Sequence, residues 1–335
     1  MKTKDLKKIL ELVKPGLASR EILEQATSLI FKDGHVWTFN DEVAVMAPLD
    51  IGVEGAVLAE PLYKLLAKLP ADGDLDITTE GDELRIKCGK SRTGIRLEPE
   101  IRLPLDEELA EPEVWIELDE GFLPALKAVL FSASRSGHLP ILTCVHITDS
   151  HMETCDEYRM TRCGGFQLEG DIKVVAKHLE RLAAYKPIED GISGNWWHFR
   201  SKEGVTYAVR MVEGEYPNLD GFLDVEGPEV EFPKELEKSL EWAAVMADDS
   251  TKFDQEVEVK LSKGMLTVRG EGPEGWAEDS LRMKYTGDPA SFKAHPAFLK
   301  EMAARSRKVT VGAEALKVEG EGDFVHVVAL DDGEE

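Results

Sequence analysis

Two kinds of hydrophobic pattern alternate along the chain and predict helices interleaved with paired strands. Apolar residues that recur three and four positions apart predict amphipathic helices, because this spacing marks one helix face. These helices span residues 4–14, 61–68, 122–134, 172–185, 234–247 and 296–305. Between them, apolar and polar residues alternate singly around short turns, as in 28–31 and 36–39, which predicts antiparallel hairpins. The order helix, hairpin, helix, hairpin occurs three times, roughly every 110 residues, and indicates an internal repeat.

The repeat predicts an α+β protein built from three like domains, each with two helices packed on antiparallel sheets. We place these domains at residues 1–110, 111–222 and 223–330, followed by an acidic tail at 331–335. A link rich in proline and acidic residues, 103–112, separates the first two domains, and Tyr216-Pro217-Asn218-Leu219 precedes the third.

The composition is that of a soluble globular protein. The chain has 335 residues, of which 42% are hydrophobic and 31% charged, enough for two or three domains with a core. No apolar run is long enough to span a membrane, and the first residues predict a charged helix rather than a signal peptide. Four cysteines without the spacing of a disulfide framework favour a reducing compartment, so we expect a cytoplasmic protein.

The distribution of charge modifies what the net charge implies. A net charge of -25 argues against contact with nucleic acid, because phosphates attract basic surfaces. The acidic residues, however, gather in predicted loops, outer strands and the tail, whereas lysine and arginine recur on the polar faces of the predicted helices. The residues of this basic set are Lys4, Lys7, Lys8, Lys64, Lys68, Lys173, Lys177, Arg181, Lys234, Lys238, Lys300 and Arg307. If the three domains form an arc and two arcs close a ring, the basic faces of these helices would line the ring. They would face duplex DNA and contact only its phosphates.

The stretch HLPILTCVHITDSHMETCDEYRMTR, residues 138–162, predicts a hairpin and resembles the central-domain hairpin of the bacterial β-type sliding clamp, the β subunit of DNA polymerase III. Cys155 and Glu157 stand where that family usually has threonine and glycine. The segment FPKELEKSLEWAAVMA, residues 232–247, resembles the helix that opens the family's last domain, and Tyr285-Thr286-Gly287 followed by HPAFL, residues 295–299, resembles a motif further along it. Tyr216-Pro217-Asn218-Leu219 resembles the link before that domain, so the resemblance covers nearly the whole chain.

The resemblance implies a crescent-shaped protomer that closes into a homodimeric ring around duplex DNA, with no catalytic activity, cofactor or metal. It implies a clamp loader and a replicative DNA polymerase as partners, the polymerase bound through a short peptide between the middle and last domains. The corresponding pocket residues here are Leu142, Cys155, Glu157, Tyr158, Arg159, Met160, Pro217, Phe222, Phe253, His295, Phe298, Val327 and Ala329. The corresponding dimer interface comprises Ile95, Leu97, Val245 and Met246.

The C-terminus departs from the family pattern. A tail resembling Met-Pro-Met usually completes the pocket, but here Val327-Val328-Ala329-Leu330 leads into the acidic tail. We therefore expect a divergent set of partner peptides, and a virus of bacteria with its own replication machinery is one hypothesis for the chain's origin.

Other functions remain open at the level of sequence. A repeat scaffold that binds proteins without touching DNA would share the same repeat. Cys144, His146, His151 and Cys155 could form a zinc site, although their spacing matches no standard zinc finger. Trp196 and Trp197 could stack on single-stranded bases, although one core and one surface ring is the expectation for a strand. A phosphate-binding loop, a dinucleotide fingerprint and a metal-spaced carboxylate cluster are all absent from the sequence, which argues against an enzyme.

Overall fold

The computed structural model describes residues 1–247 and 255–330, which form two compact units. Unit 1 comprises Met1–Asp119 and Val174–Glu213, and unit 2 comprises Glu120–Lys173 and Gly214–Glu335. The chain leaves unit 1 after residue 119, returns to it at 174 and leaves it again after 213. Residues 111–222, the predicted second domain, thus contribute to both units, and the division into three domains stays a prediction.

Unit 1 is built on an antiparallel sheet with the strand order β5-β6-β7-β4-β1-β2-β3-β15-β14-β13-β8. Its strands are β1 Ser28–Lys32, β2 His35–Phe39, β3 Val43–Pro48, β4 Gly55–Leu58, β5 Leu75–Glu80, β6 Glu83–Cys88, β7 Ser91–Glu98, β8 Ile116–Glu117, β13 Pro187–Ser193, β14 Trp196–Ser201 and β15 Thr206–Arg210. Its helices are α1 Thr3–Val13, α2 Ala59–Lys68, α3 Leu105–Glu108, α5 Ala176–Leu179 and α6 Leu182–Tyr185. Helix α1 buries Leu6, Leu10 and Val13, the face that the sequence spacing predicts.

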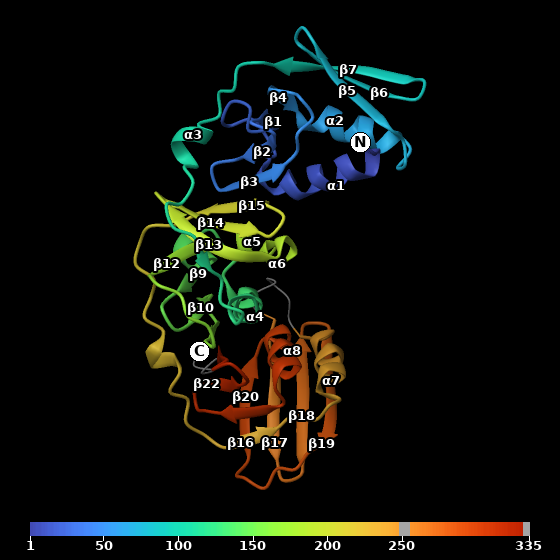
Figure 1. Ribbon diagram of the computed structural model, residues 1–335. Coiled ribbons are helices and arrows are strands. Elements are labelled where there is room, and N and C mark those ends of the chain that lie inside the picture. Colours follow the sequence, from blue (N-terminus) through green and yellow to red (C-terminus); the bar gives the residue numbers. More distant parts are fainter. Residues whose placement is uncertain (248–254, 331–335) are drawn as a thin grey trace. The chain divides into compact units, whose positions relative to one another are not determined.

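Unit 2 contains two sheets. One has the strand order β12-β9-β10-β11-β23-β22-β21-β16, and the other has the order β19-β18-β17-β20. The strands are β9 Cys144–Ile147, β10 Met152–Cys155, β11 Arg159–Cys163, β12 Ile172–Val175, β16 Glu229–Glu231, β17 Val257–Ser262, β18 Met265–Gly272, β19 Gly275–Arg282, β20 Ala290–Ala294, β21 Lys308–Val311, β22 Ala315–Glu319 and β23 Val325–Ala329. The helices are α4 Phe122–Val129, α7 Leu236–Ala244 and α8 Pro296–Arg305. Helices α7 and α8 contact each other beside the four-stranded sheet (Figure 1).

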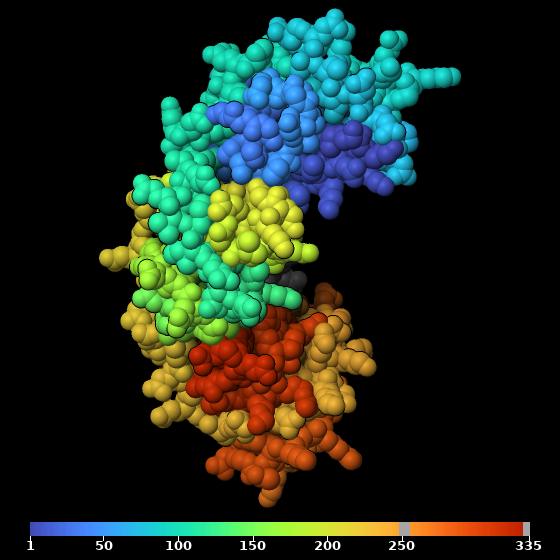
Figure 2. Space-filling view, viewed as in Figure 1, coloured from blue at the N-terminus to red at the C-terminus, as the bar shows by residue number. Residues whose placement is uncertain are grey.

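The C-terminal strands complete a sheet that begins much earlier in the chain. Strand β23 pairs with β11, so that Met160 lies opposite Val327 and Arg159 opposite Val328. In the space-filling view the segment from α8 to β23, coloured red, reaches the surface of unit 2 next to the orange segment of β17 to β19 (Figure 2). This non-local pairing brings the hairpin 138–162 together with the end of the described chain.

Most of the predicted helices are confirmed, but one is partly wrong. The predictions at 4–14, 61–68, 234–247 and 296–305 correspond to α1, α2, α7 and α8, with ends displaced by a few residues. The predicted helix 172–185 instead begins as strand β12 and continues as two one-turn helices, α5 and α6. Ile172, Val174 and Val175 are β-branched and favour an extended chain, and β12 extends the sheet beside β9.

Two shorter corrections concern the hairpin region. The strand predicted from residue 141 begins only at Cys144, because Pro140–Thr143 forms a 3-10 turn in which the Thr143 hydroxyl donates to the Pro140 carbonyl at 2.6 Å. The helix predicted at 122–134 is α4, which ends at Val129 and passes into a 3-10 turn, Leu130–Ser132.

Both tryptophans of the pair Trp196-Trp197 are buried, with 1% and 0% of their surface exposed. Trp196 packs against Phe39 with ring centroids 5.5 Å apart, and the Trp197 indole donates to Asp190 at 2.7 Å. The alternative of a stacking platform for single-stranded bases is therefore wrong, and so is the expectation of one exposed ring. Among the described residues, no helix has the length and apolar character needed to cross a membrane.

Candidate peptide-binding site

A cavity of about 1170 Å³ lies in unit 2, where the turn between β10 and β11 meets the segment 215–226 and the ends of β22 and β23. Its apolar lining includes a buried cluster in which Cys155, Met160, Leu219 and Val327 pack together. The sheet register explains this clustering, because Met160 lies opposite both Cys155 on β10 and Val327 on β23. Clefts of this size, apolar with a few polar groups, are typical of ligand and peptide sites.

Most of the predicted pocket residues line this cavity. They are Leu142, Cys155, Glu157, Tyr158, Arg159, Met160, Pro217, Phe222, Val327 and Ala329. His295 and Phe298 do not line it, although Phe298 is near a lining residue: its ring centroid is 6.1 Å from that of Tyr158 and 4.8 Å from that of His295. Phe253 lies outside the described residues. The assignment of these residues to peptide binding stays a prediction.

Several lining residues were not predicted. Tyr216 and Leu219 belong to the link that the sequence singled out, whereas Val225, Ala315 and Leu330 carry no local signal. Residues 312–315 reach the cavity only because β22 pairs with β23, with Ala315 opposite Ala329. Phe222 and Tyr158 present partly exposed rings at the opening, with 63% and 41% of their surface accessible.

Arg159 is engaged within the protein. Its Nε donates to Asp156 at 3.0 Å, one Nη pairs with Glu301, and the other donates to the Phe131 carbonyl at 3.2 Å. The guanidinium also lies 4.4 Å from the centroid of the Phe298 ring, and only 11% of the side chain is exposed. These contacts hold the turn between β10 and β11 against α8.

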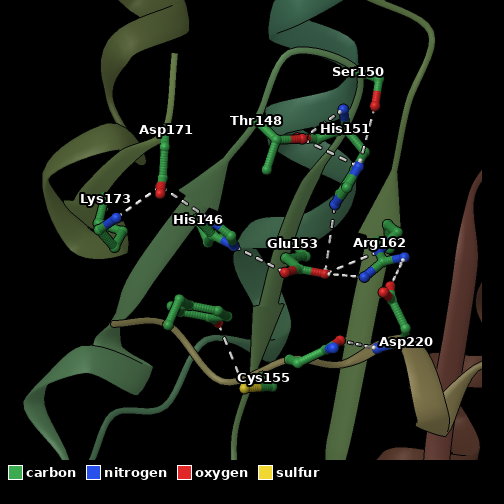
Figure 3. A network of polar contacts seen from close by, with 12 residues as sticks. His146, Thr148, Ser150, His151, Glu153, Cys155, Arg162, Asp171, Lys173 and Asp220 are labelled. Atoms are coloured by element: carbon green, nitrogen blue, oxygen red, sulfur yellow. Dashed lines mark hydrogen bonds and ion pairs between the residues drawn. The ribbon is translucent and has the colours of Figure 1, made fainter. Parts of the chain in front are cut away.

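A polar network centred on Glu153 fixes one wall of the cavity (Figure 3). The buried Glu153 carboxylate accepts from Arg162 Nε at 2.9 Å and Nη2 at 2.7 Å, and from His146 Nδ1 at 2.9 Å. Burial raises the pKa of the Glu153 carboxyl, but the hydrogen bonds from His146 and Arg162 outweigh this effect and hold the pKa below its usual value.

The same network reaches the segment that forms the cavity wall. Arg162 Nη1 pairs with Asp220 at 2.8 Å, and the His146 ring stacks on Tyr216 with centroids 4.7 Å apart. The Tyr216 hydroxyl lies 3.5 Å from the Cys155 sulfur, and burial raises the pKa of Tyr216 strongly. The sheet thus positions the segment 216–220 through the Arg162–Asp220 ion pair and the stacking of Tyr216 on His146, as well as through apolar packing.

The described residues are not arranged as the zinc-site alternative requires. Within residues 1–247 and 255–330, no group of three or more His, Cys, Asp or Glu side chains is placed to hold a metal ion. His146 and His151 both contact the Glu153 carboxylate, whereas Cys144 lies against the Pro140 carbonyl and Cys155 against Tyr216, so the four residues do not converge on one point.

Half of the basic set is paired with acidic residues. Lys4 pairs with Asp72, Lys64 with Glu60, Lys173 with Asp171, Lys177 with Glu42, Lys300 with Glu237 and Glu241, and Arg307 with Glu231. Lys173 lies on strand β12 with 11% of its side chain exposed, Lys177 lies on α5 and Arg181 precedes α6. The prediction that these three share one helix face is therefore wrong.

The predicted interface residues differ in accessibility. Ile95 and Leu97 on β7 are buried within unit 1, with 8% and 4% exposed. Val245, directly after α7, is 72% exposed, Met246 is half-buried, and Trp242 on α7 is 61% exposed. Their place in a dimer interface stays a prediction.

Comparisons with known proteins bear on the fold and on the resemblance. No protein-family model matches the chain. The β sliding clamp of Pseudomonas aeruginosa is 22% identical over 262 residues, which cover 70% of this chain and 67% of that protein. The crystal structure of a DnaN sliding clamp from P. aeruginosa bound to griselimycin matches with a TM-score of 0.84 at 17% identity, covering 99% of this chain and 98% of that one. The β subunit of the DNA polymerase of Streptococcus pyogenes matches with a TM-score of 0.83 at 18% identity over the same shares. The resemblance and the α+β clamp fold expected from the sequence are confirmed: this chain is similar in sequence to a β sliding clamp and has the fold of the bacterial β sliding clamps.

Proposed function

We propose that the chain is a DNA sliding clamp, a non-enzymatic processivity factor that works in the cytoplasm. Two copies form a ring around duplex DNA, a clamp loader places the ring there, and a replicative polymerase is held to it. The observation that carries this proposal is the match to clamp structures over 98% or more of both chains. The sequence similarity to a β sliding clamp supports it independently of the fold.

The cavity of unit 2 is the proposed docking site for partner proteins. It combines an apolar floor with partly exposed aromatic residues at its opening, which suits a short segment that inserts a few apolar side chains. Most of the residues that the resemblance assigns to a peptide pocket line this cavity, and this agreement supports the assignment.

The DNA contact is proposed to rest on those members of the basic set that have no acidic partner among the described residues. They are Lys7, Lys8, Lys68, Arg181, Lys234 and Lys238. Such side chains attract phosphates without reading sequence, and the contact weakens with salt. The dimer contact is proposed to include the exposed Val245 and the half-buried Met246, which follow α7.

Retention on circular DNA tests the central proposal. The protein is loaded with a clamp loader and ATP onto a nicked plasmid and separated from free protein at high salt. We expect the protein to remain on the circle and to leave after a restriction enzyme linearises it, because a ring holds DNA by topology. Equal retention on circular and linear DNA would contradict a ring.

The scaffold that never touches DNA stays the second candidate, and the pairing of half of the basic set with acids favours it. Lys7→Gln, Lys8→Gln and Lys68→Gln together should lower the salt at which a polymerase loses processivity. The matched control is Lys90→Gln, Lys263→Gln and Lys284→Gln, three exposed lysines of strand turns and ends. An equal effect of the two triple variants would favour the scaffold.

A further inference from the structure

We infer that the cavity of unit 2 selects peptides that carry basic residues on both sides of a short apolar anchor. This inference rests on the proposed function of the cavity and adds the chemistry of its partner. The partner is thus a lysine- or arginine-rich segment of another protein with two or three apolar residues at its centre.

The apolar anchor follows from the floor of the cavity. Met160 and Val327 lie side by side across the pair β11–β23, and both are buried together with Leu219. A neutral, apolar floor gives binding energy to leucine- or phenylalanine-like side chains and penalises a charge placed there.

The basic flanks follow from the charges around that floor. Six residues with carboxylate side chains and one arginine, Arg159, line the cavity. Five of the carboxylates form no ion pair with any described residue, and all five residues are exposed. They are Glu157, Glu215, Asp224, Glu226 and Glu314. The sixth, Asp156, pairs with Arg159.

Arg159 does not offset this charge for a ligand. It is the one cation among the described residues that line the cavity, and its guanidinium is held by Asp156, Glu301 and the Phe131 carbonyl. Among the described lining residues, a peptide carboxylate would find no free cation and would face five unpaired acids. Charge complementarity therefore favours a basic peptide and disfavours an acidic one.

The segments that carry these acidic residues are held in place by contacts within unit 2. Glu215 precedes Tyr216, which stacks on His146, and Asp224 and Glu226 follow Asp220, which pairs with Arg162. Glu314 directly precedes β22, whose Ala315 is paired with Ala329. The sheet and these contacts thus place the acidic residues in the cavity lining without a ligand to bring them together.

Fluorescence polarisation with three labelled peptides tests the inference. All share one central Leu-Phe pair, and the flanks carry three lysines, three glutamines or three glutamates. Each exposed ion pair contributes a factor of roughly 1.4 to 5 in affinity, so three predict about tenfold tighter binding of the lysine peptide than of the glutamine peptide. The ratio should fall toward one between about 0.05 M and about 0.5 M salt because the charges are screened.

Matched variants separate the cavity from the general acidity of the protein. Glu215→Gln, Asp224→Asn and Glu226→Gln together should remove most of the advantage of the lysine peptide and leave the affinity for the glutamine peptide within about twofold. The control Glu169→Gln, Glu274→Gln and Glu321→Gln removes equal charge from exposed positions away from the cavity and should leave the lysine peptide's affinity unchanged.

The outcomes distinguish the inference from the proposed function. Equal binding of the lysine and glutamine peptides, or an equal loss in both triple variants, overturns the charge selection while the peptide site stands. A lysine peptide in which two glycines replace Leu-Phe should not bind; if it binds as well as the parent, the apolar anchor is wrong. Absence of binding by all three peptides overturns the peptide site itself.

Discussion

Replacing Glu153 with glutamine should destabilise unit 2 and loosen the cavity wall. The Glu153 side chain is 4% exposed and its carboxylate accepts three hydrogen bonds, two from Arg162 and one from His146. Arg162 in turn holds Asp220 on the wall segment. The substitution keeps the shape of the side chain and one acceptor oxygen but removes the negative charge that these donors face.

The size of the destabilisation follows from the burial of the ion pair between Glu153 and Arg162. Hydrogen bonds to charged groups contribute about 1.5–3 kcal/mol each, and breaking a buried ion pair costs about 3–5 kcal/mol. Glutamine keeps part of the hydrogen bonding, and Arg162 keeps Asp220, whose side chain is 70% exposed. We therefore expect the free energy of unfolding of unit 2 to fall by about 3 kcal/mol at neutral pH.

The effect should depend on pH in a definite direction. The pKa of Glu153 is lower in the folded protein than in the unfolded chain, so its contribution is present above the unfolded value of about 4.3 and is lost as the pH falls through the folded value. The difference between the wild-type protein and Glu153→Gln should therefore shrink below about pH 4.

Urea unfolding and hydrogen exchange measure both parts of this prediction. The control is Glu169→Gln, an exposed acid in the same unit, which should change the unfolding free energy by less than about 0.5 kcal/mol. In Glu153→Gln, amide exchange should accelerate in residues 216–222 before it does so elsewhere in unit 2. A loss below about 1 kcal/mol at neutral pH, or an equal loss at low pH, would refute the argument that the buried charge holds the wall.

Three further predictions address other parts of the chain. Burial lowers the pKa of His198 to about 4, so between about pH 6.5 and 5 the wild-type protein should lose about 2 kcal/mol more stability in unit 1 than His198→Leu does, as thermal unfolding at both pH values would show. Burial raises the pKa of Cys144 and Cys155, so a thiol reagent should modify the native protein far more slowly than the urea-unfolded protein; equal rates would contradict the burial. Val245→Asp should leave the melting temperature of the monomer unchanged, because Val245 is 72% exposed, yet shift sedimentation from dimer to monomer; an unchanged dimer would place the interface elsewhere.

Elements whose pattern is local could be predicted from the sequence. Helices α1 and α8 each bury one face and carry the spacing of that face in the chain. The sequence predicts a helix at β12 because Ile172 and Val175 also fit helical spacing, but the place of this segment beside β9 in the sheet decides its conformation. The spacing of apolar residues within a segment does not reveal a partner strand that lies elsewhere in the sequence.

The cavity residues also divide into a group that one local motif contains and a group that only the fold brings together. Cys155, Glu157 and Met160 belong to one hairpin, so recognising that hairpin was enough to place them in the cavity lining. The unpaired carboxylates do not form a group in the sequence. Glu157 and Glu314 come together through the pairing of β11 with β23 and of β22 with β23, and Glu215 joins them because Tyr216 stacks on His146. A sequence shows how many acids a chain has, but only the sheet register shows which of them surround one cavity.

The charge of the chain also constrains how the proposed clamp could hold DNA. With a net charge of -25 and half of the basic set already paired, phosphate contacts alone supply little affinity, and added salt weakens them further. A protein of this charge can remain on DNA through closure of a ring, because closure does not depend on the number of ion pairs. High salt should therefore remove the protein from open linear DNA while leaving it on a circle. This expectation links the acidic composition, which by itself argued against DNA, to a topological mode of holding it.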